Sequence, residues 1–269
     1  MLKKSLSQHL IRDKNITAKL VKAAGVEATD TVVEIGAGHG DLTGPLCEKA
    51  GFVYAVELDR TCAEYLETLQ KKYKNLEVIF GDILKTPLAQ FKREKRLKIV
   101  GNIPYQITAP IIFKILEERT IIESVYLTMQ KEIALRIASP PFSRAYGAIS
   151  AVCRIFADVK ILFFMKPGLF VPPPKIDSAF VSMVLKEDEY ATDNELMSFA
   201  RASFQNKRKY LSYALSKMID GETLSALYQA MGFPPSIRAE EVEPQKIKEI
   251  YEWIKARKEG AHIKRTGPA

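Results

Sequence analysis

Hydrophobic positions follow two different periods in the first hundred residues. Short runs rich in β-branched and aromatic residues predict buried strands, at residues 31–35, 52–57, 76–80 and 97–100. Apolar residues spaced three or four apart predict helices between them, at residues 15–24, 42–50 and about 60–73. We expect Asn15 or Thr17 to cap the first helix and Asp59 or Thr61 the third. Strands that alternate with helices predict a parallel, doubly wound α/β sheet.

The pattern changes after the polar segment at residues 186–192. Before it, further helices and strands alternate, at residues 110–119, 123–129, 130–138, 143–156, 159–165 and 178–185. After it, the pattern is helical only, at residues 194–204, 210–219, 223–231 and 244–258. We therefore expect an α/β domain over residues 1–185, a small all-helical domain over 186–258, and a disordered tail over 259–269.

Candidate chemistry gathers where the first four predicted strands end. Glycines at 36, 38 and 40 follow the first strand, and Glu57, Asp82 and Asn102 stand at the ends of the next three. The carboxyl ends of parallel strands meet at one edge of a sheet, where open α/β folds bind ligands. We expect these residues to share one site.

The glycine-rich loop has three interpretations. A phosphate-binding P-loop needs a Gly-Lys-Ser/Thr ending, which is absent, and dinucleotide folds prefer Gly-X-Gly-X-X-Gly. A nucleoside without a pyrophosphate fits better. The loop would then approach its ribose and tail, Glu57 would bind the ribose diol, and Asp82 would accept from an adenine amine. Alternatively, Glu57 and Asp82 are simply helix caps.

The turn from Gly101 to Tyr105 suits a flat substrate that carries an amino group. Asn102 offers a side-chain carbonyl, and we expect the Pro104 carbonyl to be a second acceptor without a competing local N–H. Tyr105 supplies an aromatic ring beside them. The alternative is that Asn102 caps a helix that begins near Thr108.

Two later segments are candidates for substrate binding. Three prolines stiffen residues 170–178, so Phe170 either forms a second stacking surface for a base or packs inward. Lys207 and Arg208 lie in a compact basic cluster that either binds phosphates or forms a solvated helix face.

Charge and composition narrow the class of protein. The net charge is +8, and residues 1–185 carry 26 Lys+Arg against 19 Asp+Glu, with one cluster at Lys92, Arg93, Lys95, Arg96 and Lys98. This excess favours a polyanionic partner, although lysine-rich helix faces would give the same composition. The three scattered cysteines predict neither a metal site nor disulfides, and the chain shows no secretory signal or bilayer-spanning run.

Six motifs occur in one order, at residues 34–43 (EIGAGHGDLT), 57–59 (ELD), 81–82 (GD), 102–105 (NIPY), 130–132 (QKE) and 170–178 (FVPPPKIDS). Over residues 5–258 the chain resembles the KsgA/RsmA family of ribosomal RNA adenine dimethyltransferases. The resemblance implies a Rossmann-like class I methyltransferase sheet, mostly parallel with an antiparallel edge hairpin. It also implies S-adenosylmethionine as methyl donor and no metal.

The resemblance further implies the reaction and the partners. The acceptors would be N6 of two adjacent adenines near the 3′ end of small-subunit (16S) rRNA, within the immature small ribosomal subunit. We expect a cytoplasmic monomer without a membrane partner.

The same resemblance assigns roles to individual residues. Asn102, Pro104 and Tyr105 would act on the acceptor amine, and Tyr105 and Phe170 would stack the flipped base. The cofactor contacts would fall on His9, Ile11, Gly36, Gly38, Glu57, Asp82 and Asn102. The family's usual Gln-Asn-Phe-Leu is Gln-His-Leu-Ile at residues 8–11 here, and a contact through backbone atoms would survive that change.

Other functions remain alternatives. An Erm-type methyltransferase of large-subunit rRNA shares the Asn102 turn, but the Phe170 loop argues against it. A non-catalytic RNA-binding, assembly or transcription factor would not need the intact glycine loop with Glu57, Asp82 and Asn102. A dehydrogenase is disfavoured by the spacing of the glycines.

Overall fold

The computed structural model describes residues 9–11, 13–206 and 209–265, so Lys207 and Arg208 lie outside the described residues. The chain divides into two compact units. The first contains the residues up to 135 and residues 157–192, and the second contains residues 136–156 and those from 193 onward.

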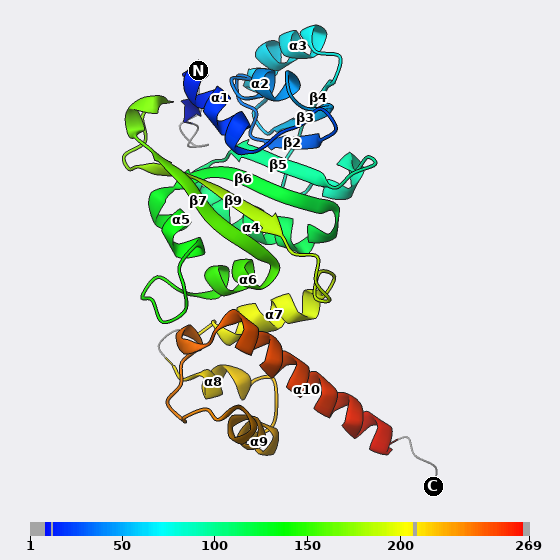
Figure 1. The fold of residues 1–269 in the computed structure, drawn as a ribbon, viewed down its shortest axis with the longest axis vertical. Coiled ribbons are helices and arrows are strands. Elements are labelled where there is room, and N and C mark those ends of the chain that lie inside the picture. The colour runs from blue at the N-terminus through cyan, green and yellow to red at the C-terminus, as the bar shows by residue number, and fades with distance from the viewer. Residues whose placement is uncertain (1–8, 12, 207–208, 266–269) are drawn as a thin grey trace. The chain divides into compact units, whose positions relative to one another are not determined.

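The first unit is built on a seven-stranded mixed sheet (Figure 1). Its strands lie in the order β4 (Leu76–Phe80), β3 (Phe52–Glu57), β2 (Thr31–Ile35), β5 (Leu97–Asn102), β6 (Ile122–Gln130), β9 (Ser178–Leu185) and β7 (Ala157–Met165). The first five strands are parallel, and β9 and β7 are antiparallel to their neighbours. The predicted fold, a mostly parallel sheet with an antiparallel edge hairpin, is confirmed.

Helices bury apolar side chains against this sheet. They are α1 (Lys14–Ala23), α2 (Thr43–Cys47) and α3 (Ala63–Lys72). Two further helices are α4 (Thr108–Glu117) and α5 (Lys131–Ile137). Leu20 of α1, Leu46 of α2 and Leu66 of α3 are fully buried in one cluster that contains residues of β2, β3 and β5. The cap of α1 is Asp13, which accepts from the backbone N–H groups of Asn15 and Ile16, so the predicted cap at Asn15 or Thr17 is wrong.

A second, two-stranded sheet joins the beginning of the described chain to the proline-rich segment. In it, β1 (Leu10–Ile11) pairs antiparallel with β8 (Phe170–Val171), with Leu10 opposite Val171 and Ile11 opposite Phe170. Two-residue strands are too short to show a hydrophobic period, so the sequence did not predict them. This pairing brings residues 9–11 to the carboxyl edge of the large sheet.

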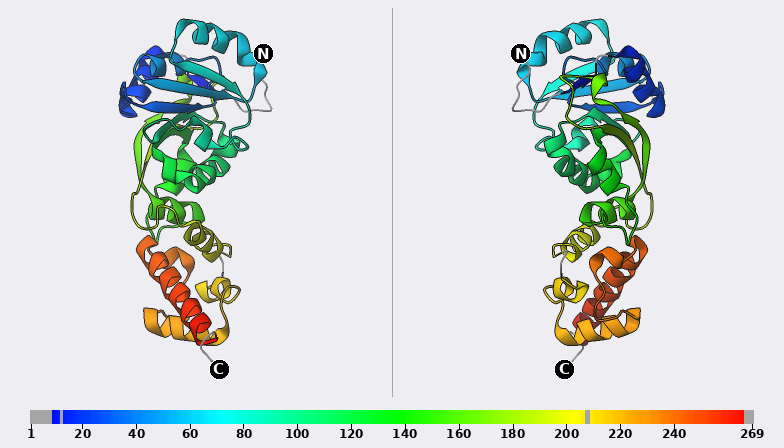
Figure 2. Two further views of the ribbon diagram at one scale, coloured as in Figure 1. Left: turned by 90° about the vertical axis from the view of Figure 1, so that its right-hand side faces the viewer. Right: turned by 90° about the vertical axis from the view of Figure 1, so that its left-hand side faces the viewer.

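The second unit is helical. Its helices are α6 (Ala148–Phe156), α7 (Asn194–Ser203), α8 (Leu211–Leu215), α9 (Gly221–Met231) and α10 (Pro244–Arg265). Helix α10 packs against α6, α7 and α9 (Figure 2). Although α6 precedes two strands of the sheet in the chain, its apolar face is buried among the C-terminal helices. A domain boundary placed by sequence order alone assigns it to the sheet, and α10 also continues beyond residue 258 to Arg265.

Within the described part of the chain, every helix is too short or too polar to cross a lipid bilayer.

Candidate functional site

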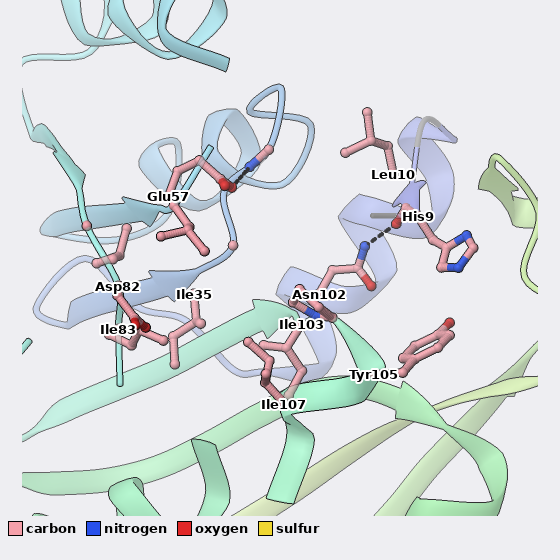
Figure 3. Close-up of a pocket in the computed structure, with 16 residues that line it drawn as sticks. His9, Leu10, Ile35, Glu57, Asp82, Ile83, Asn102, Ile103, Tyr105 and Ile107 are labelled. Carbon is pink, nitrogen blue, oxygen red and sulfur yellow. Dashed lines mark hydrogen bonds between the residues drawn. The ribbon is translucent and has the colours of Figure 1, made fainter. Parts of the chain in front are cut away.

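A pocket opens where β2, β3, β4 and β5 end (Figure 3). Its lining includes eight of the residues that the sequence predicted, His9, Gly36, Gly38, Glu57, Asp82, Asn102, Pro104 and Tyr105. The remaining wall is mostly apolar, with Ile35, Leu58 and Ile83 among its members. Four successive strand ends and the β1 segment therefore contribute to one cavity.

The glycine loop presents bare backbone to this pocket. Gly36 and Gly38 have φ angles of 76° and 56°, a region that side chains with a Cβ rarely adopt. The Gly36 N–H donates to the Val56 carbonyl at 2.9 Å, which holds the loop on the end of β3. A Cβ at Gly38 would stand 2.8 Å from Cδ2 of Leu10. The loop is thus packed closely under β1 at Gly38, and the positive φ angles of Gly36 and Gly38 favour glycine at both positions.

Glu57 is a buried carboxylate held by backbone donors. Its Oε2 accepts from the Gly38 N–H and its Oε1 from the Asp59 N–H, each at 2.8 Å, and the residue is only 4% exposed. The cap of the following 3₁₀ turn is Asp59, so Glu57 is not a helix cap. Each carboxylate oxygen keeps a further lone pair, so Glu57 can accept from a diol in the pocket.

Asp82 keeps one oxygen for a ligand. Its Oδ1 accepts from the Leu84 N–H at 3.0 Å in a local Asx turn. Its Oδ2 has no hydrogen-bond partner among the residues that the structure describes. An acceptor in this position suits an amino group of a bound base.

Glu34 lies beneath the glycine loop and was not assigned a role from the sequence. It is 1% exposed and accepts from the Thr43 hydroxyl at 2.6 Å. Burial raises its pKa to about 8, and the charges of Glu57 and Asp41 act in the same direction. The signal in the sequence is a lone acid inside a β-branched strand, Thr31–Ile35, of which all five residues are buried.

The Asn102 side chain is oriented by the N-terminal segment. Its Nδ2 donates to the His9 backbone carbonyl at 2.6 Å (Figure 3), which leaves the side-chain oxygen as the free end of the amide. In the described regions, that oxygen has no hydrogen-bond partner. Helix α4 begins at Thr108 and has no side-chain cap, so the alternative that Asn102 is a helix cap is wrong.

The Pro104 carbonyl was expected to have no local donor, but the structure places one beside it. The chain after Pro104 forms a 3₁₀ turn, η4 (Tyr105–Ile107), and this turn brings the Ile107 N–H to 3.2 Å from the carbonyl oxygen. The turn itself was expected, but the carbonyl was expected to lack a local donor, and that expectation is wrong because the turn is a 3₁₀ turn that supplies the Ile107 N–H. A carbonyl oxygen has two lone pairs, so one acceptor position remains.

Tyr105 is fixed from two sides by distant segments. Its hydroxyl lies 2.6 Å from Oγ of Ser178, which is fully buried, and burial raises the pKa of Tyr105. The His9 ring stacks on the Tyr105 ring at 5.5 Å between centroids, and His9 Nδ1 lies 2.6 Å from the Pro172 carbonyl. Ser178 closes the motif at residues 170–178 but was assigned no role from the sequence, because it looks like an ordinary first residue of a strand.

Phe170 does not form the expected stacking surface. It is 2% exposed and belongs to the same core cluster as Ile11 and Phe180, and it does not line the pocket. The pairing of β8 with β1 places Phe170 opposite Ile11. Because both side chains turn into the core, Ile11 also contributes no side chain to the pocket, although β1 brings the neighbouring backbone of His9 to it.

Other reactive groups are scarce around this pocket. The cysteines Cys47, Cys62 and Cys153 are buried, and burial raises the pKa of Cys153 to about 12, so it stays a thiol. Within residues 9–11, 13–206 and 209–265, no group of three or more His, Cys, Asp or Glu side chains could hold a metal ion. The arrangement offers hydrogen-bond acceptors and an aromatic ring instead of a nucleophile.

Comparisons with known proteins show the family of the chain. The family described as "Ribosomal RNA adenine dimethylase" matches residues 1–256. A protein of Shouchella clausii, "Ribosomal RNA small subunit methyltransferase A", is 36% identical over 258 residues, which cover 91% of this chain and 87% of the relative. A dimethyladenosine transferase from Plasmodium falciparum has a similar structure, with a TM-score of 0.76, 26% identity, and coverage of 92% and 98% of the two chains.

The structure of the 23S rRNA methyltransferase ErmE is also similar, with a TM-score of 0.69 and coverage of 91% of this chain and 98% of that one. At 23% identity, this likeness shows the shared fold alone. The family match across nearly the whole chain and the 36% identity to the bacterial relative are much more specific. The chain therefore belongs to the ribosomal RNA adenine dimethylase family.

Proposed function

We propose that this protein transfers methyl groups from S-adenosylmethionine to N6 of two adjacent adenines near the 3′ end of small-subunit (16S) rRNA. It would act as a monomer on immature small ribosomal subunits in the cytoplasm. The observation that carries the proposal is the free Asn102 side-chain oxygen at the rim of a pocket that also contains the glycine loop and two carboxylates. Membership of the adenine dimethylase family supports the same reaction.

The residues of the first half of the pocket fit the methyl donor. Bare backbone at Gly36 and Gly38 lets its ribose and tail approach closely, Glu57 accepts from the ribose diol, and Asp82 accepts from the adenine amine. When bound, S-adenosylmethionine supplies an electrophilic methyl group on a sulfonium. The apolar side chains of Ile35, Leu58 and Ile83 exclude water around the base.

The second half of the pocket would prepare the acceptor. An adenine amine is a weak nucleophile because its lone pair is delocalised into the ring. If its two N–H groups donate to Asn102 Oδ1 and to the remaining lone pair of Pro104, the nitrogen becomes pyramidal and its lone pair localises. Tyr105 would stack on the flipped base and hold the nitrogen in line with the methyl group.

Small-subunit rRNA is preferred to large-subunit rRNA on the strength of the relatives. The protein that is 36% identical over 91% of this chain is named a small subunit methyltransferase. The likeness to the 23S rRNA enzyme is limited to the fold.

The test compares two substrates with radiolabelled S-adenosylmethionine. Immature small subunits from cells that lack this protein should acquire label, and mass mapping should place two dimethylated adenines side by side near the 3′ end of their rRNA. Naked large-subunit rRNA should stay unlabelled. Label in the large-subunit RNA alone would support the Erm-type function, and absence of cofactor binding would support a non-catalytic RNA-binding protein.

A further inference from the structure

The edge of the sheet opposite the catalytic pocket carries a basic cleft. It is lined by the beginnings of β2 and β3 with the residues before them, and by the loop before β5, including Thr29, Asp30, Phe52, Lys92, Arg93 and Lys95. Because β2, β3 and β5 are parallel, this cleft lies where these strands begin and the catalytic pocket lies where they end. The basic cluster of this loop stands out in the sequence, and the proposed reaction does not use it.

Arg93 is exposed yet held in one orientation. Its guanidinium carbon lies 3.5 Å from the ring centroid of Phe52, and its Nε donates to the hydroxyl of Tyr54 at 3.1 Å. In the parts of the chain that are described, its two terminal NH₂ groups have no hydrogen-bond or ion-pair partner. A planar fork fixed by its Nε and by stacking can present parallel donors to two oxygens of one phosphate.

The surrounding charges leave the cleft positive. Lys98 is buried and donates to Asp30 at 2.8 Å, so this acid is already neutralised. Burial disfavours the Lys98 ammonium, but the hydrogen bond to Asp30 raises its pKa overall. Lys95 donates to the Thr29 hydroxyl at 2.7 Å. Among the described residues, neither Lys95 nor Lys92 has an acidic partner. Glu94 is the one other acid in the lining, against Lys92, Arg93 and Lys95.

We propose that this cleft binds a backbone phosphate of the RNA substrate and gives the protein a second anchor, remote from the reacting adenine. The inference rests on the proposed function, because it assigns the polyanion to rRNA. The Arg93 fork contacts the phosphate oxygens, and Lys92 and Lys95 add long-range attraction. Free inorganic phosphate has the same oxyanion chemistry, so the experiment must separate the two sources.

The experiment compares two double variants that lose the same charge. Lys92→Gln/Lys95→Gln changes the cleft, and Lys160→Gln/Lys186→Gln changes the antiparallel edge of the same unit. Binding to immature small subunits is measured by filter retention between about 50 and 200 mM salt. We expect the slope of log affinity against log salt to fall by about 1 to 2 in the cleft variant only. The KM for subunits should rise about tenfold there at physiological salt, with kcat and cofactor affinity unchanged.

Arg93→Lys tests the fork itself, because it keeps the charge and removes the planar pair of donors. We expect it to raise the KM for subunits about threefold to tenfold while the salt slope stays near that of the wild type. Thermal unfolding of each variant checks that the fold is retained.

Three results would overturn the assignment. The cleft double variant could match the Lys160/Lys186 control in slope and KM. Arg93→Lys could leave the KM for subunits unchanged. Inorganic phosphate, tested against chloride of equal ionic strength, could bind wild type and not the cleft variant while both retain the same affinity for subunits. If the wild type neither binds nor methylates subunits, the proposed function fails instead.

Discussion

The two halves of the proposed active-site pocket are held together in different ways. On the cofactor side, the bonds join residues that are close in sequence: Gly38 donates to Glu57, 19 positions away, and Thr43 to Glu34, 9 positions away. On the acceptor side, Asn102 donates to His9 across 93 positions, and Tyr105 contacts Ser178 across 73. The cofactor side is therefore shaped by adjacent turns and strands, and the acceptor side by tertiary contacts.

This difference predicts separable functions. Changes in the locally built half should weaken cofactor binding and leave the acceptor geometry intact. Changes in the acceptor half should slow methyl transfer at unchanged cofactor affinity. Each prediction below tests whether the halves are as independent as their bonding indicates.

The largest effect is expected for Asn102→Ala. It removes the oxygen that would accept from the adenine amine, and loss of one aligned transition-state partner costs about 10²-fold or more in turnover. Single-turnover methylation of immature small subunits measures the rate, and equilibrium dialysis measures cofactor affinity.

The matched control for Asn102→Ala is Thr108→Ala, a change of a buried side chain one turn along the same segment whose hydroxyl donates to the Tyr105 carbonyl. It should cost far less activity than Asn102→Ala. Near-normal turnover in Asn102→Ala would refute the role of the amide. A large parallel loss of cofactor affinity would show that the two halves are not separable.

Glu57→Gln should produce the opposite pattern. The amide keeps one acceptor for the Gly38 or Asp59 N–H but loses the charge, and hydrogen bonds to a charged group are worth about 1.5–3 kcal/mol. We expect cofactor affinity to fall about 10- to 100-fold, with a smaller effect on kcat at saturating cofactor. Isothermal titration of the cofactor gives the affinity, and an unchanged value would contradict the assignment of Glu57.

The same division explains which features could be predicted from the sequence. The parallel sheet, the glycine loop and the alignment of Glu57, Asp82 and Asn102 followed from strand patterns and from residues at strand ends. The choice between stacking and inward packing of Phe170 could not be made from the sequence, because it depends on the pairing of two-residue strands that lie far apart in the chain, with Ile11 opposite Phe170. The hydrogen bond of the Pro104 carbonyl depends on a single 3₁₀ turn, which is too short to show a hydrophobic pattern in the sequence.

A pH-dependent effect is expected at Glu34, on the cofactor side. Its pKa rises from 4.5 to about 8, so the native state keeps a proton that the unfolded chain loses. The resulting stabilisation is complete below pH 4.5 and is lost as the pH rises toward about 8. Glutamine does not titrate, so the unfolding free energy of Glu34→Gln minus that of the wild type should increase by at most about 4 kcal/mol as the pH rises from 5 to 8. Urea unfolding at both pH values measures this difference, and parallel curves for the two proteins would contradict it.

The smallest effect is expected for Tyr105→Phe, which keeps the ring and removes only its bond to Ser178. The serine hydroxyl is fully buried, and loss of its partner costs about 1 kcal/mol of stability. If this bond orients the ring, methyl transfer should fall about threefold to tenfold while cofactor affinity stays the same.

Ser178→Ala should reproduce the loss seen in Tyr105→Phe, and the double variant should be no worse than the poorer single variant. This corresponds to a coupling of about 1 kcal/mol in a double-mutant cycle. Independent, additive losses would mean that the stack on His9 alone holds the ring. The long-range bond would then be structural only, and the acceptor side would be less dependent on tertiary contacts than the comparison of the two halves indicates.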